Sequence, residues 1–279
     1  MKPLLKIQGS KAKISDWIVN NIKKHWNGDG VYFEPFMGCG IVGFKLLPQK
    51  AVFSDTNPDI IEFFKYIQKN DIKDIADALN EHGFYLKEQG EPYYYEIRER
   101  FNETRTTPDF IFLNRTCFNG VMRYNKKGHF NVPFCKENDR LHPDYLSKIT
   151  LEISRFQAIA KEHDWLFACK SYLDVFPKIK DCDFIYADPP YADRENQYMD
   201  GWEHEDERTF HKAVRALTCK WAVSSWKESH INKHGRKNKY MKFWEKDYTI
   251  QTQDHHYGVG PNAKTRPKVT EVLITNESS

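Results

Sequence analysis

Residues 184–191 read FIYADPPY: an apolar run carries one carboxylate, Asp188, to its end and then breaks on two prolines. A carboxylate and a neighbouring main-chain carbonyl can accept both hydrogens of a planar amino group, such as the exocyclic amine of a nucleobase. Pro189 supplies that carbonyl from a backbone of fixed φ, and Pro190 restricts Pro189 in turn. Tyr191 offers a flat face on which a flipped-out base can stack. These residues predict a rigid clamp for one amino-bearing base; the alternative is a strand-ending turn with a capping aspartate.

A second segment, EPFMGCG at 34–40, has the composition of a turn between a strand and a helix. Glycines in such a turn allow the backbone to approach a ligand closely, and the N-terminus of the following helix favours anionic groups. The spacing is F-x-G-x-G and not the G-x-G-x-x-G of dinucleotide enzymes. Asp55 ends the next predicted strand, where an acid can bind ribose hydroxyls. The alternative for Asp55 is to cap the following helix, since the chain continues DTNPD.

The periodicity of apolar residues predicts the elements that position these two segments. Apolar residues at helical spacing after Ser15 predict a capped helix over 15–25. A strand, the turn at 34–40 and a helix follow, and then a second strand that ends in Asp55 and a helix over 58–69. The alternation resumes later with helix 143–162, strand 165–170, a helix start at 171–176, strand 183–187, helix 206–217, strand 220–225 and an edge or hairpin strand at 269–276. This order is typical of an α/β fold with a doubly wound sheet.

Residues 71–142 interrupt this alternation with a mostly helical, polar stretch. Within it, FLNRTCFNGVMRYNKKGHFNVPF at 112–134 is too rich in Asn, Gly and Arg for a core helix, and we predict a loop or hairpin module there. We therefore expect one α/β domain made of 1–70 and 143–279, with 71–142 inserted as a smaller domain.

The composition excludes several classes of protein. The chain has 279 residues, of which 40 % are hydrophobic and 29 % charged, so it can build a packed core. No segment approaches the roughly 20 apolar residues needed to cross a bilayer, and the N-terminus lacks the features of a signal peptide, so we expect a cytoplasmic location and no membrane partner. The cysteines form no C-x-x-C pair, which argues against a zinc site and a disulfide framework. A net charge of +3, with basic clusters among aromatics, permits nucleic-acid binding without requiring it.

Three motifs in this order, EPFMGCG, FLNRTCFNGVMRYN…GHFNVPF and DPPY, resemble those of the DNA adenine-N6 methyltransferases of the Dam type, the D12 class. The resemblance extends over essentially the whole chain. It is greatest to the GATATC-specific branch of restriction–modification methyltransferases, which shares EPFMG-G, DTNP, YYYE-RERFN and NVPFCK. The resemblance implies a Rossmann-like, S-adenosylmethionine-dependent methyltransferase sheet, with 71–142 as an inserted, mostly helical target-recognition domain.

The resemblance also implies a cofactor, S-adenosyl-L-methionine, with S-adenosyl-L-homocysteine as its product, and no metal. The residues that match the cofactor-binding segments of the family are Ile7, Gln8, Gly9, Lys11, Glu34, Pro35, Phe36, Gly38, Gly40, Asp55, Phe167 and Asp188. Ser171 is a further candidate for the adenine pocket. In much of the family the first segment reads K-W-x-G-G-K, whereas here it reads KIQGSK, so Ile7 replaces an aromatic residue and Ser10 a glycine. For Ile7 and Phe167 the alternative is ordinary core packing.

The same resemblance places DNA contacts on the insertion and beside the first cofactor segment. The matching residues are Lys6, Arg115, Phe118, Asn119, Arg123, Asn125, Asn131 and Pro133. Arginine can bond two acceptors of guanine, asparagine can bond adenine, and Phe118 can wedge into the base stack and support base flipping. The alternative for the arginines is contact with phosphate alone. We predict a further DNA-facing loop, with phosphate contacts, at 255–269.

The predicted activity is transfer of a methyl group from S-adenosylmethionine to adenine N6 in a short, palindromic, GAT-containing duplex site. Asp188, Pro189, Pro190 and Tyr191 are the predicted catalytic residues, the transfer is direct, and no cysteine is expected beside them. Double-stranded DNA is the expected partner, together with a cognate restriction endonuclease acting on the same site. Three rivals stay open at this point: methylation of cytosine N4, which the same clamp can hold, methylation of RNA, and a catalytically silent DNA-binding regulator.

Overall fold

The computed structural model describes residues 1–191, 201–229, 236–256 and 268–276. Helices are written α, or η where they are 3-10 helices, and strands are written β. In chain order the elements are η1 (Lys11–Lys13), α1 (Ser15–His25), β1 (Tyr32–Glu34), α2 (Ile41–Leu46), β2 (Lys50–Asp55), α3 (Pro58–Lys69), α4 (Ile72–Gln89), α5 (Glu91–Thr104), α6 (Thr107–Thr116), η2 (Phe118–Gly120), α7 (Pro143–Glu162), β3 (Asp164–Cys169), α8 (Tyr172–Val175), η3 (Phe176–Lys178), β4 (Phe184–Ala187), α9 (His204–Arg215), β5 (Lys220–Ser229), β6 (Arg236–Lys237), η4 (Lys239–Phe243), β7 (Thr249–His256) and β8 (Lys268–Thr275).

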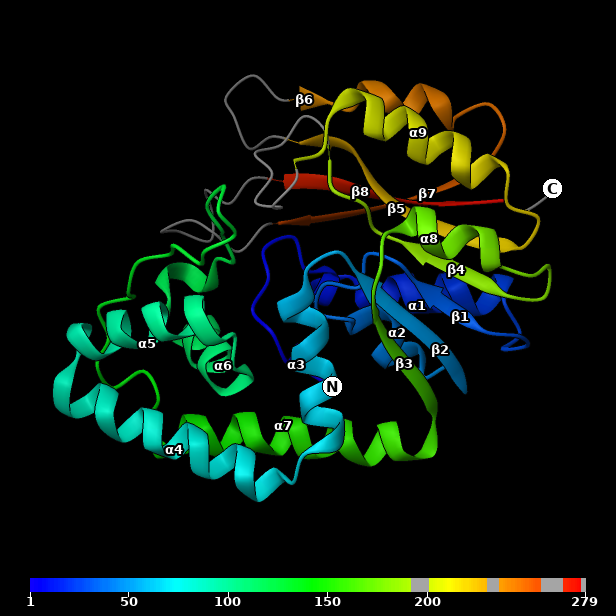
Figure 1. Ribbon diagram of the computed structural model, residues 1–279. Helices are drawn as coiled ribbons and strands as arrows, with labels where there is room; N and C mark the ends of the chain where they lie inside the picture. The colour runs from blue at the N-terminus through cyan, green and yellow to red at the C-terminus, as the bar shows by residue number, and fades with distance from the viewer. Residues whose placement is uncertain (192–200, 230–235, 257–267, 277–279) are drawn as a thin grey trace.

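The strands form one sheet in the order β3-β2-β1-β4-β5-β8-β7, and the short strand β6 pairs with β5 (Figure 1). Strands β3, β2, β1, β4 and β5 are parallel to one another. Strand β8 is antiparallel to both of its neighbours, so β7 runs in the same direction as the five parallel strands. The strand order reverses between β1 and β4. Because open α/β sheets bind ligands at the carboxyl ends of strands where the order reverses, the ends of β1 and β4 are the expected place for a site.

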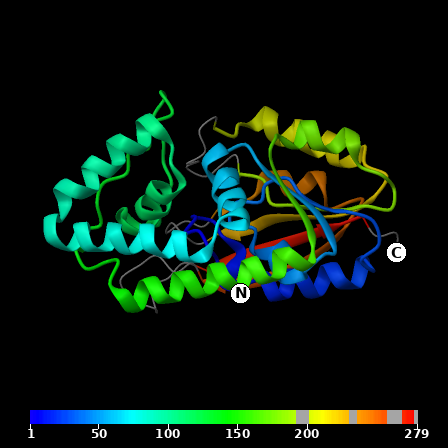
Figure 2. The same cartoon turned by 60° about the horizontal axis from the view of Figure 1, so that its bottom comes forward.

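Helices cover both faces of this sheet (Figures 1 and 2). Helices α8 and α9 lie on one face, where Ile185 and Val223 belong to the apolar layer. Helices α1, α2 and α7 lie on the other face, where Phe184 and Ala222 pack. All four residues of β4 are buried, as expected of a parallel strand covered on both sides. The predicted α/β fold class is therefore confirmed.

Helices α4, α5 and α6 lie to one side of the sheet, and α7 packs against α4 and α3 before it leads into β3 (Figure 1). One prediction for this region is wrong, because residues 112–116 are not a loop but the buried end of α6. The polar side chains are accommodated there by bonds to the main chain. Asn114 bonds both the N–H and the carbonyl of Lys6, and the Thr116 hydroxyl donates to the Phe112 carbonyl at 2.7 Å.

The C-terminal strands agree with the prediction in part. Strand β8 pairs antiparallel with β7, as the hairpin alternative expects, but it is not at the edge of the sheet, because it also pairs with β5. Strand β7, whose sequence TIQTQDHH is mostly polar, was not predicted, and it is the edge strand. A polar edge strand exposes one face to solvent and carries little apolar periodicity, so its sequence resembles a loop. No helix in the described ranges combines the length and the apolar character needed to cross a membrane.

Candidate active site

The turn after β1 has the backbone geometry that its glycines allow. Gly38 and Gly40 both have positive φ, +48° and +63°, in the left-handed region that residues with a Cβ rarely adopt. A Cβ on Gly40 would lie 2.5 Å from the ring of Phe44, whereas a Cβ on Gly38 would meet nothing closer than the Ile7 Cδ1 atom at 3.9 Å. The turn therefore needs glycine at 40 for packing, and at 38 it leaves the backbone open to a ligand.

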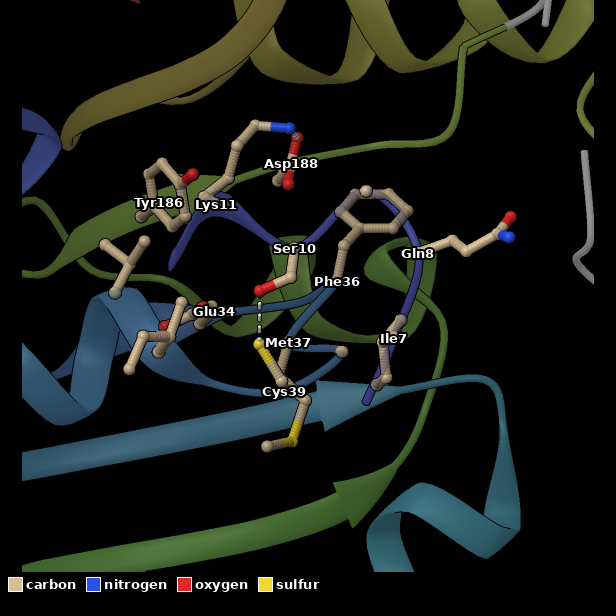
Figure 3. Close-up of a pocket in the computed structure, with 14 residues that line it drawn as sticks. Ile7, Gln8, Ser10, Lys11, Glu34, Phe36, Met37, Cys39, Tyr186 and Asp188 are labelled. Carbon is tan, nitrogen blue, oxygen red and sulfur yellow. Dashed lines mark hydrogen bonds and ion pairs between the residues drawn. The ribbon is translucent and has the colours of Figure 1, made fainter. Parts of the chain in front are cut away.

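A pocket lies beside this turn, at the carboxyl ends of β1 and β4 (Figure 3). Most of the predicted cofactor residues line it: Ile7, Gln8, Gly9, Lys11, Glu34, Phe36, Gly38 and Asp188. The lining also includes Ser10, Met37 and Cys39, which lie within the predicted segments 7–11 and 34–40. Ile41, Val42 and Tyr186 line it too and were not predicted. The N-terminal segment is held across the turn, since the Ser10 hydroxyl and the Cys39 thiol are 3.2 Å apart. Tyr186 could have been predicted, because it lies two residues before Asp188 in a strand and so shares its face.

Four predicted cofactor residues, Pro35, Gly40, Asp55 and Phe167, are not among the residues that line this pocket. The Asp55 carboxylate accepts bonds from the main-chain N–H of Gly38 at 3.0 Å and of Asn57 at 2.9 Å, so it joins the glycine turn to the end of β2. Burial raises the pKa of Asp55, and these hydrogen bonds oppose the shift. The side chain is 5 % exposed, and in this structure it braces the turn and does not face the pocket.

Phe167 packs in the core in this structure. Its side chain is 3 % exposed and stacks on Phe53 and Phe64, with ring centroids 5.4 and 5.3 Å away. Its place on β3 directs it toward the helices on that face of the sheet, and its role in an adenine pocket stays a prediction. Ser171, the other candidate for the adenine pocket, caps α8 by accepting from the Leu173 N–H.

Glu34 ends β1 with a buried carboxyl group. Its Oε2 atom accepts from the Tyr32 hydroxyl at 2.9 Å and from the Gly43 N–H at 3.0 Å. Burial raises the pKa of Glu34 to about 8, more than these two hydrogen bonds lower it, and the nearby Asp188 raises it further. A Cβ on Gly43 would lie 2.6 Å from this oxygen, so glycine is needed for the close approach.

The tetrad after β4 is held by a lysine from the N-terminal segment. Lys11 Nζ lies 2.8 Å from Asp188 Oδ1 and donates to the Tyr191 hydroxyl at 3.0 Å. The Tyr191 hydroxyl in turn donates to Asp188 Oδ1 at 3.2 Å, and the ammonium group lies 5.2 Å from the centre of the tyrosine ring. Pro189 and Pro190, between them, are buried. Lys11 was predicted as a cofactor residue; the structure places it both in the pocket lining and against the Asp188 carboxylate.

Asp188 is more basic than an ordinary aspartate. Burial is the largest cause that raises its pKa, and Lys11 and the Tyr191 hydroxyl lower the pKa, while Glu271 raises it. Glu271 comes from β8, is 1 % exposed, and has its Oε2 atom 3.8 Å from Lys11 Nζ. Sequence reasoning missed Glu271, although one acid inside the apolar strand VTEVLIT is a recognisable signal.

The cysteine of the glycine turn lies in the lining of the cofactor pocket. Cys39 is 4 % exposed, and burial raises the pKa of its thiol. A thiol with a raised pKa is a poor nucleophile, so direct transfer remains the chemistry that this site favours. All six cysteines are free, and the described residues contain no cluster of His, Cys, Asp and Glu that could hold a metal ion.

The predicted DNA-contacting residues between 118 and 133 form a short hairpin-like module. Isolated bridges join Cys117 to Phe134 and Tyr124 to Phe130. Phe118 is 52 % exposed, and it is followed by Asn119 with φ +55°. Asn125 shapes the turn, because its side-chain oxygen accepts from the main-chain N–H groups of residues 127 and 129. Arg123 and Pro133 are exposed, and the Arg123 Nε donates to the Asn131 side chain at 2.8 Å.

Arg115 does not belong to this exposed module. It is 9 % exposed, and its guanidinium donates to the Leu4 carbonyl and to the Tyr145 hydroxyl. In this structure the Arg115 guanidinium therefore links the N-terminal segment to α6, and its N–H groups are not exposed for contact with a base. Lys6 is half-buried beside it, with Nζ 5.7 Å from the centre of the Tyr145 ring. Of the predicted loop 255–269, residues 257–267 lie outside the described residues.

Arg105, which was not predicted, joins the module to the sheet domain. Its guanidinium donates to the Asp59 carboxylate at 2.9 Å and to the Gly128 carbonyl, and it lies 5.8 Å from the centre of the Tyr124 ring. Asp59 is in the first turn of α3, and its main-chain N–H donates to the side chain of Asn57, the N-cap of that helix. The module is thus tied to the helix that follows Asp55 and the glycine turn.

The lining of the pocket suits S-adenosylmethionine. Asp188 is a carboxylate that complements the positive charges of the cofactor, Glu34 adds a buried carboxyl group, and Ile7, Met37 and Val42 are apolar. The open backbone at Gly38 allows a close approach. A mostly parallel sheet with this order, a glycine turn after its first strand and DPPY after its fourth define a Rossmann-like, S-adenosylmethionine-dependent methyltransferase.

Comparison with known proteins gives the family. Residues 8–259 match the family described as D12 class N6 adenine-specific DNA methyltransferase, and the chain belongs to this family. The chain is 32 % identical over 209 residues to the type II methyltransferase M.MjaIII of Methanocaldococcus jannaschii, covering 68 % of this chain and 69 % of that protein. It is 25 % identical over 286 residues to the type II methyltransferase M1.LlaDCHI of Lactococcus lactis subsp. cremoris, covering 99 % and 95 %. It is 30 % identical over 195 residues to the DNA adenine methylase of Escherichia coli (strain K12), covering 68 % and 65 %.

Proposed function

We propose that this DNA adenine-N6 methyltransferase flips one adenine out of a short duplex site and holds its amino group between Asp188 and the Pro189 carbonyl. The observation that supports this most is the position of Asp188: it ends β4 at the switch point of the sheet, in the lining of the cofactor pocket. Both of its recorded bonds go to Oδ1, so within the described structure Oδ2 is available to an amino hydrogen.

The residues of the clamp activate a poor nucleophile. The lone pair of an exocyclic amine is delocalised into the ring, and hydrogen bonds from its two hydrogens to a carboxylate and a carbonyl make the nitrogen more tetrahedral. S-adenosylmethionine supplies the activated methyl group when bound. Positive charge develops on the amine during transfer, and the Asp188 carboxylate stabilises it from a buried position. The proton then leaves to water or through Asp188, and the Tyr191 ring stacks on the base.

The cofactor residues divide into three roles. Ile7, Gln8, Gly9, Phe36 and Gly38 shape the pocket, with Ile7 packing on the cofactor where many relatives have an aromatic residue. Lys11 and Asp188 give the pocket its charges, and Glu34 lines it as a buried carboxyl group. Pro35, Gly40 and Asp55 hold the turn from behind.

DNA recognition is assigned to residues 71–142, with 1–70 and 143–279 as the catalytic domain. Phe118, exposed at the tip of the hairpin-like module, suits a wedge that enters the base stack as the adenine leaves it. Asn119, Arg123, Asn125 and Pro133 are exposed around it, while Lys6 and Asn131 are partly buried and support the module. Of the two predicted arginines, Arg123 is assigned to read a guanine, because it is exposed and Arg115 is buried.

The recognition site we propose is a palindrome that contains GAT, with GATATC preferred because of the shared segments DTNP, YYYE-RERFN and NVPFCK. Two of the similar proteins are called type II methyltransferases, which supports a cognate restriction endonuclease as a partner in a restriction–modification system. The proposed substrate is double-stranded DNA, with or without a partner endonuclease.

Sequencing that detects modified bases on single molecules of plasmid DNA, prepared from a methylation-deficient host expressing the protein, tests this proposal. We expect N6-methyladenine in one short palindrome, and none when Asp188→Ala is expressed instead. N4-methylcytosine would contradict the base assignment, and N6-methyladenine at a site without GAT would contradict the recognition site.

A further inference from the structure

Glu271 is a buried acid in a strand that is otherwise apolar at its centre. It lies on β8 between Trp226 of β5 and Gln253 of β7, and its side chain is 1 % exposed. Residue alternation puts it on the same face as Leu273, the face covered by the N-terminal segment. Burying a carboxylate is costly unless it is paired, so its position requires a specific partner.

That partner is the group that also holds the catalytic carboxylate. Lys11 Nζ lies 2.8 Å from Asp188 Oδ1 and 3.8 Å from Glu271 Oε2. The Tyr191 hydroxyl is likewise shared, 3.2 Å from Asp188 Oδ1 and 3.5 Å from Glu271 Oε2. One lysine and one hydroxyl therefore lie between two carboxylates, of which only Asp188 belongs to the known tetrad.

We propose that Glu271 is a positioning residue for methyl transfer: it draws Lys11 and the Tyr191 hydroxyl to one side of Asp188 and so keeps Oδ2 of Asp188 for the amino group of the base. The inference rests on the proposed role of Asp188. Without the Glu271 charge, the Lys11 ammonium is drawn more strongly to Asp188 and competes with the base for that carboxylate. Glu271 divides that attraction between two acceptors.

The pH dependence of the reaction distinguishes this role from simple packing. Asp188 must be ionised to accept an amino hydrogen, so its pKa sets the acidic limb of the rate. The titratable groups that face it are Lys11 from η1, Tyr191 beside it, Glu271 from β8, Tyr186 from β4 and Glu34 from β1. Glu271 raises the pKa of Asp188 and Lys11 lowers it. Removal of the Glu271 charge therefore moves the acidic limb to lower pH, and removal of the Lys11 charge moves it to higher pH.

The experiment measures single-turnover transfer of a radiolabelled methyl group to unmethylated plasmid DNA as a function of pH. The variants are Glu271→Gln, Lys11→Met, the double variant that carries both, and Asp188→Ala. Thr275→Val is the matched control, because Thr275 is equally buried on β8 and its hydroxyl has no recorded hydrogen-bond partner in the described structure. Affinities for the cofactor and for the plasmid are measured on the same preparations.

We expect Glu271→Gln to slow transfer at least about tenfold, with both affinities within about threefold of wild type. Its acidic limb should move to lower pH, that of Lys11→Met to higher pH, and that of the double variant should return toward wild type. Thr275→Val should match wild type. A Glu271→Gln rate close to wild type, or a reduced rate with an unmoved acidic limb, would overturn the inference.

Two further outcomes are decided by the other variants. If Asp188→Ala retains activity, the proposed function fails and the inference fails with it. If Asp188→Ala is inactive while Glu271→Gln is normal, only the inference fails. Should Glu271→Gln not fold, the double variant removes both buried charges together; an acidic limb identical to that of Lys11→Met would then overturn the proposal.

Discussion

Replacing Glu34 with glutamine should change how the stability of the protein depends on pH. Glu34 is 3 % exposed, and its Oε2 accepts from Tyr32 and Gly43. Because burial raises its pKa from 4.5 to about 8, the folded protein keeps this carboxyl protonated at neutral pH, whereas the unfolded chain ionises it. Glutamine cannot ionise, and its carbonyl oxygen can accept the same two hydrogen bonds.

The sign and size follow from the two pKa values. The stability that comes from the protonated carboxyl is fully present below pH 4.5 and is lost as the pH rises through about 8. Within that interval the folded state binds one proton more than the unfolded state, so the free energy of unfolding falls by about 1.4 kcal/mol per pH unit. The whole shift amounts to about 5 kcal/mol, an upper limit for this group.

Urea unfolding, followed by tryptophan fluorescence, measures the effect between about pH 5.5 and about pH 7.5. We expect Glu34→Gln to gain about 2–3 kcal/mol relative to wild type across that range. Asp55 and Asp188 also have raised pKa values, but they are present in both proteins and largely cancel in the difference. Parallel pH curves for the two proteins would show that Glu34 is ionised throughout, and would refute the reasoning.

Three further predictions concern the glycine turn and the recognition module. Gly40→Ala should destabilise the protein by at least about 2 kcal/mol in urea unfolding, because φ is +63° and the Cβ would lie 2.5 Å from the Phe44 ring; a neutral effect would mean that the turn relaxes. Phe118→Ala should reduce the fluorescence rise of 2-aminopurine placed at the target adenine, with stability changed by less than about 0.5 kcal/mol; an undiminished rise would exclude the wedge. Arg105→Met should slow single-turnover methylation about tenfold by releasing the module from Asp59, while cofactor affinity stays the same; weaker cofactor binding with normal DNA binding would contradict this.

Much of the fold was predictable because its signals are local. Apolar runs, Pro58 in the first turn of α3 and the glycines at 38 and 40 predicted strands and helices close to those observed. The predicted cap at Ser15 is wrong, because Ser15 is the first residue of α1 and that helix has no side-chain capping bond. The position of β8 was not predictable in the same way, since strand order depends on pairings between distant segments. Strand β7 was missed because a polar edge strand lacks apolar alternation.

The site was predictable where the backbone or one motif defines it, and less so where side chains from distant segments meet. Asp188 and the turn at 34–40 lie where the sequence indicated. Phe167 and Arg115 matched motif positions, but burial directs both side chains inward, which spacing alone does not show. Lys11, Asp188 and Glu271 come from η1, the end of β4 and β8, which are far apart in the sequence. No local sequence pattern therefore reveals the contact between them.

The central claim is that the Asp188 carboxylate activates the amino group of a flipped adenine. Single-turnover methylation of unmethylated plasmid DNA by wild type and by Asp188→Ala tests it most directly, with cofactor and DNA affinities measured alongside. In the variant Lys11 keeps Glu271 as a partner, so the fold should be maintained. The account predicts that the rate falls by about two to three orders of magnitude while both affinities stay within about threefold. A variant that methylates adenine at the wild-type rate would contradict it.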